Sequence, residues 1–169
     1  EYDWNAANRP NLALIYAKGN IHEGTGTRGL SIGSETLAAA IRSARLNPTV
    51  AAIVLRVDSG GGSALASDVI AREVALCSLG SRPKPVVVSM GGVAASGGYM
   101  ISAPGSRIFA TPGTITGSIG VIAMVPDISG LLEMFEVESE TIVTTESADV
   151  PNITRPLTEK EKELIRRSV

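Results

Sequence analysis

The sequence predicts an α/β fold in which a mainly parallel sheet is covered by helices. The consecutive β-branched residues at 86–88 are typical of a strand that is buried on both faces, and the largely apolar runs at 11–17 and 50–57 predict two further strands. Segments with helical spacing of apolar residues alternate with these runs, and short glycine turns separate the two kinds of segment. Such alternation is typical of parallel sheets whose strands are joined by crossover helices.

The first half of the chain supplies two predicted strands and two predicted helices. Residues 11–17 form a strand, and residues 35–46 form a helix with Leu37 and Ile41 on one face. Residues 50–57 form the second strand, and residues 64–78 form the second helix, in which Cys77 is expected to be a core residue. Between the first strand and the first helix, the glycine- and threonine-rich residues 21–34 predict a mobile loop.

In the second half, a strand at 86–88 is expected to end at Gly91 and Gly92, before a short helix at 96–103. The remaining predicted elements are a strand at 107–110, a loop at 111–120, helix 127–135, a strand at 140–144 and a helix from Thr158. Thr158 and Glu161 have the spacing of a capping box. Residues 1–10 are interpreted as a linker or arm, and residues 11–169 as a single domain.

Composition limits the classes of function. The 169 residues are 44% hydrophobic and 19% charged, as expected for one soluble globular domain. A net charge of −2 and 4% aromatic residues argue against nucleic acid as a partner. With one cysteine, one histidine and no clustered carboxylates, we expect no metal site and no cofactor. No apolar run approaches the roughly 20 residues that span a bilayer. Because the chain starts without methionine and stops inside a helical pattern, we expect a fragment truncated at both ends.

Ser96 is the candidate nucleophile. It follows a buried strand, and its neighbours are two alanines before it and Gly97 and Gly98 after it. These small residues leave room for other backbone, or a substrate, to approach the hydroxyl. The alternative is that Ser96 only caps a helix, because serine is a preferred N-cap residue.

A second glycine turn, at residues 60–62, follows the neighbouring predicted strand. The carboxyl ends of parallel strands share one edge of a sheet, so this turn and Ser96 should be close in space. Backbone N–H groups of Gly61, Gly62 and Gly97 could then stabilise an oxyanion in acyl transfer. A tight turn or a phosphate loop is the alternative, although neither common phosphate-loop spacing is present.

No general base stands out in the sequence. A Ser-His-Asp triad would require His22 to reach Ser96 from the predicted loop. None of the lysines looks like a buried, neutral amine, since Lys18 ends the first strand and the other three are expected to be surface charges. These three are Lys84, Lys160 and Lys162.

Three motifs together resemble the signal peptide peptidase A family of serine peptidases. They are residues 58–63 (DSGGGS), 87–99 (VVSMGGVAASGGY) and 114–121 (TITGSIGV), and the resemblance covers residues 12–155. It implies a Clp-protease/crotonase-like fold and hydrolysis of peptide bonds by a Ser-Lys dyad. By motif, Ser96 corresponds to the nucleophile, Gly62 and Gly97 to the oxyanion donors, and Ser118 to the serine that holds the lysine ammonium.

The sequence departs from the short form of this family in one respect. The short form carries its lysine about fifty residues after the nucleophile, whereas residues 144–156 (TTESADVPNITRP) contain none. The chain instead resembles the C-terminal repeat of the double-length form, in which the N-terminal repeat supplies the lysine. We therefore expect a fragment that carries the nucleophile, lacks the base and is inactive alone.

The resemblance also implies signal peptides or other peptides as substrates, the remaining domains of a parent protein as partners, and a homo-oligomer. The parent is expected to be anchored in the bacterial cytoplasmic membrane with this domain on the outer face. Val93, Met100 and Ile119 are candidates for an apolar cleft, with ordinary core packing as the alternative. Two other functions stay open: a scaffold repeat without catalysis, and a crotonase-type acyl-CoA enzyme.

Overall fold

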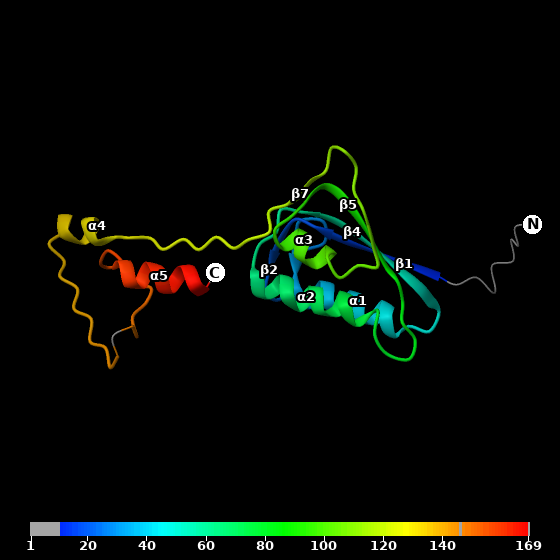
Figure 1. Ribbon diagram of the computed structural model, residues 1–169, viewed down its shortest axis with the longest axis horizontal. Coiled ribbons are helices and arrows are strands. Elements are labelled where there is room, and N and C mark those ends of the chain that lie inside the picture. The colour runs from blue at the N-terminus through cyan, green and yellow to red at the C-terminus, as the bar shows by residue number, and fades with distance from the viewer. Residues whose placement is uncertain (1–10, 146, 169) are drawn as a thin grey trace, which may run out of the picture. The chain divides into compact units, whose positions relative to one another are not determined.

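Residues 11–145 and 147–168 are described by the computed structural model in Figure 1. The chain divides into two compact units, with the boundary between Ile119 and Gly120. Unit 1 contains the sheet and its helices, and unit 2 contains two further helices. The predicted arm at residues 1–10 lies outside the described residues, and the single domain at 11–169 stays a prediction.

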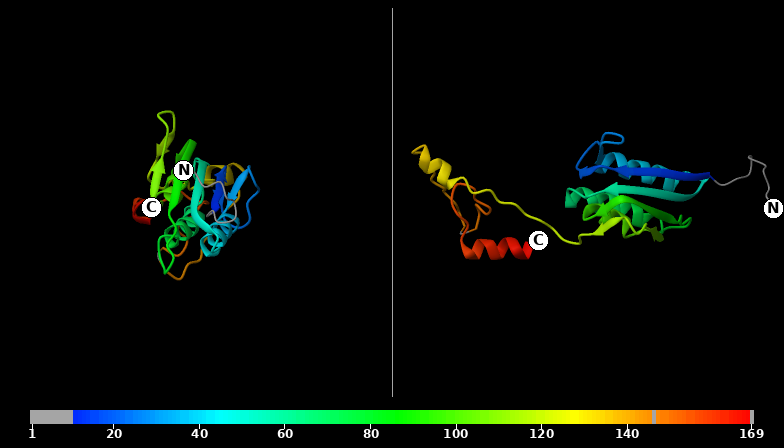
Figure 2. Two further views of the ribbon diagram at one scale, coloured as in Figure 1. Left: turned by 90° about the vertical axis from the view of Figure 1, so that its right-hand side faces the viewer. Right: turned by 90° about the horizontal axis from the view of Figure 1, so that it is seen from above.

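The larger sheet of unit 1 has five strands, and every pairing in it is parallel. Its strands are β1 (Asn11–Lys18), β4 (Val50–Ser59), β5 (Val86–Ala95), β6 (Arg107–Phe109) and β7 (Ile115–Gly117). The order is β1-β4-β5-β6, and β7 pairs with the last three residues of β5. Figure 2 shows β1, β4 and β5 side by side. The predicted class, a mainly parallel α/β sheet with helices, is confirmed.

Three helices lie on one face of this sheet: α1 (Ser34–Leu46), α2 (Ala64–Leu76) and α3 (Gly97–Ser102) (Figure 1). Alternate residues of β4, namely Ile53, Leu55 and Val57, face them and are fully buried. Ile41 of α1 and Ile70 of α2 complete the centre of this core. Each such side chain contributes about 1.5–3 kcal/mol through burial, so the core fixes how the strand ends meet.

The segment predicted as a loop at residues 21–34 contains a second, two-stranded sheet. Strand β2 (Asn20–His22) pairs in parallel with β3 (Ser31–Gly33). Ile21 and Ile32 are buried, and Ile21 also bridges to Gly62. The loop prediction is therefore wrong at both ends of the segment, because two isolated isoleucines give no periodic signal in sequence yet anchor the strands in the core.

Gly91 and Gly92 do not end the strand that is predicted at residues 86–88. Strand β5 continues through Gly91 and Gly92 to Ala95, although the sequence predicts a break there. The predicted loop at residues 111–120 likewise contains a strand, β7. Both corrections have one cause, since residues 93–95 find hydrogen-bonding partners in β4 and β7 that are distant in sequence.

Unit 2 contains α4 (Ser129–Met134) and α5 (Glu159–Ser168). The capping box that opens α5 is confirmed: the N–H of Glu161 donates to Thr158 Oγ1 at 3.3 Å, and the N–H of Thr158 donates to Glu161 Oε2 at 2.7 Å. The predicted strand at 140–144 is wrong. Ile142 is 91% exposed, and the segment pairs with no described strand, which a strand needs.

Candidate active site

Ser96 occupies the junction between β5 and α3. Its φ of +51° lies in the left-handed region that residues other than glycine rarely adopt. Ser96 stands at the N-cap position of α3, but its side chain makes no capping hydrogen bond. Ser96 therefore has the N-cap position that the alternative interpretation expects, but its hydroxyl does not cap the helix. Such backbone strain costs about 1–3 kcal/mol and is concentrated at functional sites.

The glycine turn after β4 lies directly beside Ser96, as the strand ends predict. A Cβ added to Gly61 would lie 2.9 Å from the Cβ of Ser96 and 2.7 Å from the backbone nitrogen of Gly97. Gly61 and Gly62 both have positive φ, at +102° and +150°. Only glycine permits both this backbone conformation and this close approach.

The backbone N–H groups of Gly62 and Gly97 are available at this junction. Gly97 is the first residue of α3, so its N–H has no acceptor within the helix. The two bonds that join Ile21 to the turn use the carbonyl of Gly61 and the N–H of Ser63, so they leave the Gly62 N–H unused. A Cβ added to Gly97 would lie 3.4 Å from the Gly62 nitrogen. The two glycines are thus neighbours, and N–H donors on adjacent backbone segments could polarise one carbonyl oxygen.

Buried serines pack around these glycines. Ser67 of α2 is fully buried, and its Oγ would lie 2.4 Å from a Cβ on Gly97. Ser59 Oγ accepts a hydrogen bond from the N–H of Gly61 at 3.1 Å, within the turn. Neither Ser59 nor Ser67 is identifiable from the sequence pattern, because a lone serine in an apolar strand or helix carries no spacing signal.

Ser118 follows Gly117, the residue of β7 that pairs with Ala95 at the end of β5. The N–H of Ser96 donates to the carbonyl of Gly117 at 2.9 Å, which brings the loop after β7 to the end of β5. Ser118 has a φ of +50° and is exposed in this chain. Its predicted role, holding a lysine ammonium, stays a prediction.

The two lysines of unit 1 lie at opposite ends of the parallel strands, one at the carboxyl end of β1 and the other before the start of β5. Lys18 is exposed at the end of β1. The prediction that Lys84 is a surface charge is wrong: Lys84 is 7% exposed, and its Nζ donates to the carbonyl of Ala44 at 2.9 Å and to that of Asn47. These carbonyls are left open at the C-terminus of α1, where a cation is favoured. Lys84 precedes β5, whereas Ser96 follows it.

His22 is also placed elsewhere, at the end of β2. Its Nε2 lies 3.1 Å from Ser31 Oγ and its Nδ1 lies 2.7 Å from the carbonyl oxygen of Glu23. Both ring nitrogens of His22 therefore already have partners, one in the neighbouring strand β3 and one in the next residue of the chain. This geometry does not support a Ser-His-Asp triad with Ser96.

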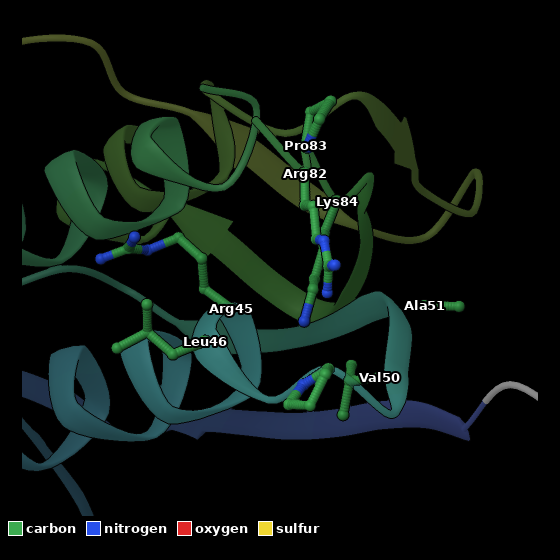
Figure 3. Close-up of a pocket in the computed structure, with 8 residues that line it drawn as sticks. Arg45, Leu46, Val50, Ala51, Arg82, Pro83 and Lys84 are labelled. Atoms are coloured by element: carbon green, nitrogen blue, oxygen red, sulfur yellow. The ribbon is translucent and has the colours of Figure 1, made fainter. Parts of the chain in front are cut away.

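A cavity of about 220 Å³ lies at the opposite edge of the sheet (Figure 3). It is lined by the end of α1, the start of β4 and the segment before β5, and its charged lining residues are Arg45, Arg82 and Lys84. Ser96 is not among its lining residues. Within the described ranges, no group of three or more His, Cys, Asp or Glu residues could hold a metal ion.

The three residues proposed to line an apolar cleft are not part of the buried core. Val93 is half-buried, Met100 is 37% exposed and Ile119 is 83% exposed. The alternative of ordinary core packing is therefore wrong for Met100 and Ile119 in this chain. Their exposure is compatible with contact to a substrate or to another chain.

Comparison with known proteins adds the family. A sequence model of peptidase family S49 matches residues 79–169, more than half of the chain. Protease 4 of Salmonella typhi is 44% identical over 158 residues, which cover 94% of this chain and 25% of that protein. The chloroplastic serine protease SPPA of Arabidopsis thaliana is 39% identical over 164 residues, 95% of this chain and 24% of that protein. The chain thus spans about a quarter of the length of these relatives.

A solved structure shares the fold. A serine-to-alanine mutant of the 1510-N membrane-bound stomatin-specific protease aligns with a TM-score of 0.53 and 22% sequence identity. The alignment covers 69% of this chain and 51% of that chain. This likeness bears on the fold alone, and it agrees with the parallel sheet and covering helices of unit 1.

Proposed function

The chain belongs to peptidase family S49, and from this premise we propose that it is the part of a serine peptidase that carries the nucleophile, Ser96. One observation supports the proposal above others. The strained Ser96 backbone stands beside the glycine turn, where the Gly97 N–H has no acceptor within α3 and the bonds between Ile21 and the turn leave the Gly62 N–H unused. Gly61 supports the turn that presents them.

The proposed chemistry is acyl transfer. A neutral lysine amine accepts the proton of Ser96 Oγ while this oxygen attacks the carbonyl carbon of the peptide bond. The carbonyl oxygen becomes negatively charged, and the N–H groups of Gly62 and Gly97 donate to it. In other enzymes one such donor lowers the barrier by about 3–4 kcal/mol. The lysine ammonium then gives its proton to the leaving amine as the C–N bond breaks.

The acyl-serine ester is resolved by the reverse use of the same groups. The lysine amine takes a proton from water as the water oxygen attacks the ester carbon, and the lysine ammonium then gives this proton to the Ser96 oxygen as the C–O bond to Ser96 breaks. The carboxylic acid product leaves, and Ser96 and the neutral lysine are restored. Ser118 is proposed to hold the lysine in place, because it follows Gly117, whose carbonyl accepts a hydrogen bond from the N–H of Ser96. This cycle needs no metal and no cofactor.

We place the general base outside this chain. Lys84 is held by the end of α1, Lys18 is exposed at the end of β1, and the remaining lysines belong to α5 of unit 2. The relatives are about four times as long as the matched segment, so they have room for a second repeat that carries a lysine. The isolated chain is then inactive.

Substrate and location follow from the family resemblance and are proposals as well. We propose cleaved signal peptides as substrates, assembly into a homo-oligomer, and a parent protein anchored in the bacterial cytoplasmic membrane with this domain outside. No helix in the described part of the chain is long and apolar enough to cross a membrane.

A serine-reactive fluorophosphonate probe tests the proposed function in the full-length protein. We expect labelling at Ser96, loss of labelling in Ser96→Ala, and normal labelling in Ser78→Ala, which changes an exposed serine after α2. A folded full-length protein in which Ser96 stays unlabelled would contradict the proposal and favour a scaffold repeat. Binding of coenzyme A that survives Ser96→Ala would instead favour an acyl-CoA enzyme.

A further inference from the structure

Strand β5 carries extra residues immediately before the nucleophile. Val57 of β4 pairs with Met90, but Ser59, two residues later, pairs with Ala94. Asp58 therefore faces three residues of β5, at positions 91–93, which we call the bulge segment. A bulge bends a strand and leaves backbone groups without ladder partners, and bulges are frequent next to active sites.

Two charged side chains of β4 bond to the backbone at the two ends of the bulge segment. Arg56 Nη1 donates to the carbonyl of Met90 at 3.0 Å, just before the segment. Asp58 Oδ1 accepts a hydrogen bond from the N–H of Val93 at 3.2 Å, at its end. Arg56 and Asp58 are two residues apart on a strand, so both lie on the same face of the sheet. Both are half-buried.

Asp58 also fills the space that Gly91 leaves. A Cβ added to Gly91 would lie 2.9 Å from the Cβ, the Cγ and the Oδ1 of Asp58. The opposite side of the segment is held by Thr114, whose Oγ1 donates to the carbonyl of Gly91 at 2.9 Å. The path of β5 through its glycines is thus determined by side chains from two other segments.

The same residue connects both halves of the candidate active site. Asp58 precedes Ser59, whose hydroxyl accepts from Gly61 in the glycine turn. Its partner Val93 begins the stretch 93–95 that pairs with β7 and leads into Ser96. A shift of the bulge segment would therefore move the Ser96 hydroxyl relative to the N–H of Gly62.

We propose that Arg56 and Asp58 are positioning residues: by bonding the backbone at Met90 and Val93 they hold the bulge segment and so fix Ser96 against the glycine turn. Neither touches the reacting atoms in this proposal. The expected effect on catalysis rests on the proposed peptidase function, whereas the expected effect on the order of the bulge segment does not.

The kinetic test compares Asp58→Ala and Asp58→Asn in the full-length protein, with Asp68→Ala of α2 as an exposed control. Asparagine keeps an oxygen acceptor for the N–H of Val93, and alanine does not. Because small misplacements of a reacting group cost about 100-fold in rate, we expect Asp58→Ala to lower kcat by about this factor with KM nearly unchanged. Asp58→Asn should recover kcat to within about 10-fold of wild type, which is a gain of one order of magnitude or more over alanine. Equal kcat in the alanine variant and wild type would overturn the proposal.

Hydrogen exchange provides a readout that does not depend on activity. We expect faster amide exchange in peptides that contain residues 90–97 in Asp58→Ala, and wild-type exchange there in Asp58→Asn and Asp68→Ala. Unchanged exchange at 90–97 in Asp58→Ala would overturn the proposal even if activity is lost, and so would a uniform rise over the whole chain. If the wild-type protein hydrolyses no peptide, the proposed function fails, and exchange in these variants still decides whether Asp58 holds the bulge segment.

Discussion

A Cβ placed on Gly61 would stand 2.9 Å from the Cβ of Ser96, so these two residues are in direct contact across the ends of β4 and β5. The contact joins Gly61 of the glycine turn to the candidate nucleophile, which lies 35 positions later in the sequence. It makes the size of residue 61 a test of the proposed site.

Gly61→Ala should damage the site while Gly60→Ala should not. Alanine at 61 would overlap Ser96 and Gly97 and would adopt a φ of +102°, at a cost of about 1–3 kcal/mol in stability. Gly60 has no atom within 4 Å of its added Cβ, so it is a matched control. Fluorophosphonate labelling of full-length protein and urea unfolding measure both effects. Labelling of Gly61→Ala at the wild-type rate would contradict the site geometry.

Ser118→Ala should slow peptide hydrolysis in the full-length protein. Loss of one hydrogen bond to a charged group costs about 1.5–3 kcal/mol, which corresponds to roughly 10- to 150-fold in rate. The measurement is kcat/KM on a peptide substrate, with Ser78→Ala as the control. A Ser118→Ala variant as fast as wild type would remove this serine from the mechanism.

Lys84→Met should reduce stability and leave catalysis intact. The Nζ of Lys84 satisfies the carbonyls of Ala44 and Asn47, and leaving these acceptors unpaired costs about 1–3 kcal/mol. Lys18→Met changes an exposed lysine and should cost little. Urea unfolding gives the free energies of unfolding, and kcat of the folded variant gives the second result. Abolished kcat in folded Lys84→Met would mean that this lysine is the base after all.

Acid should weaken unit 2 through Glu161. A hydrogen bond from Arg155, together with the N–H of Thr158, lowers the pKa of Glu161 from its ordinary 4.5 to about 2. Because the folded pKa is the lower one, the stabilisation is complete above about 4.5 and is lost as pH falls from there towards 2.

Far-UV circular dichroism of urea unfolding between pH 6 and pH 2 measures this dependence, with Glu161→Gln as the comparison. Glutamine has no carboxylate to protonate, so the variant should be less stable at pH 6 and lose less on acidification. An identical pH dependence in both proteins would show that Glu161 does not contribute. Asp149 also pairs with Arg155, and its pKa is lowered mainly by a hydrogen bond from Asn152, with Arg155 as the next cause. Asp149 and the other carboxylates whose pKa is lowered, Glu73, Asp127 and Glu159, contribute to the dependence that remains.

Local patterns predicted the parts of the fold that depend on neighbouring residues. The apolar run at 50–57 predicted β4, and the Thr158–Glu161 spacing predicted the start of α5. The contact between the two glycine turns was also predictable, because parallel strands end at one edge of the sheet.

The errors concern residues whose state is decided by distant partners. Gly91 looks like the end of a strand until Asp58 fills the space beside it. Lys84 looks exposed until the open end of α1 accepts its ammonium group. Neither partner is visible from local spacing, and the same is true of the roles we propose for Arg56 and Asp58.

Hydrolysis of an apolar signal peptide by the isolated chain, side by side with the full-length protein, tests most directly the claim that Ser96 works with a base from elsewhere. The account predicts no turnover by the isolated, folded chain, and turnover by the full-length protein that Ser96→Ala abolishes. Turnover by the isolated chain that is abolished by Ser96→Ala would contradict it, because the base would then lie within these 169 residues.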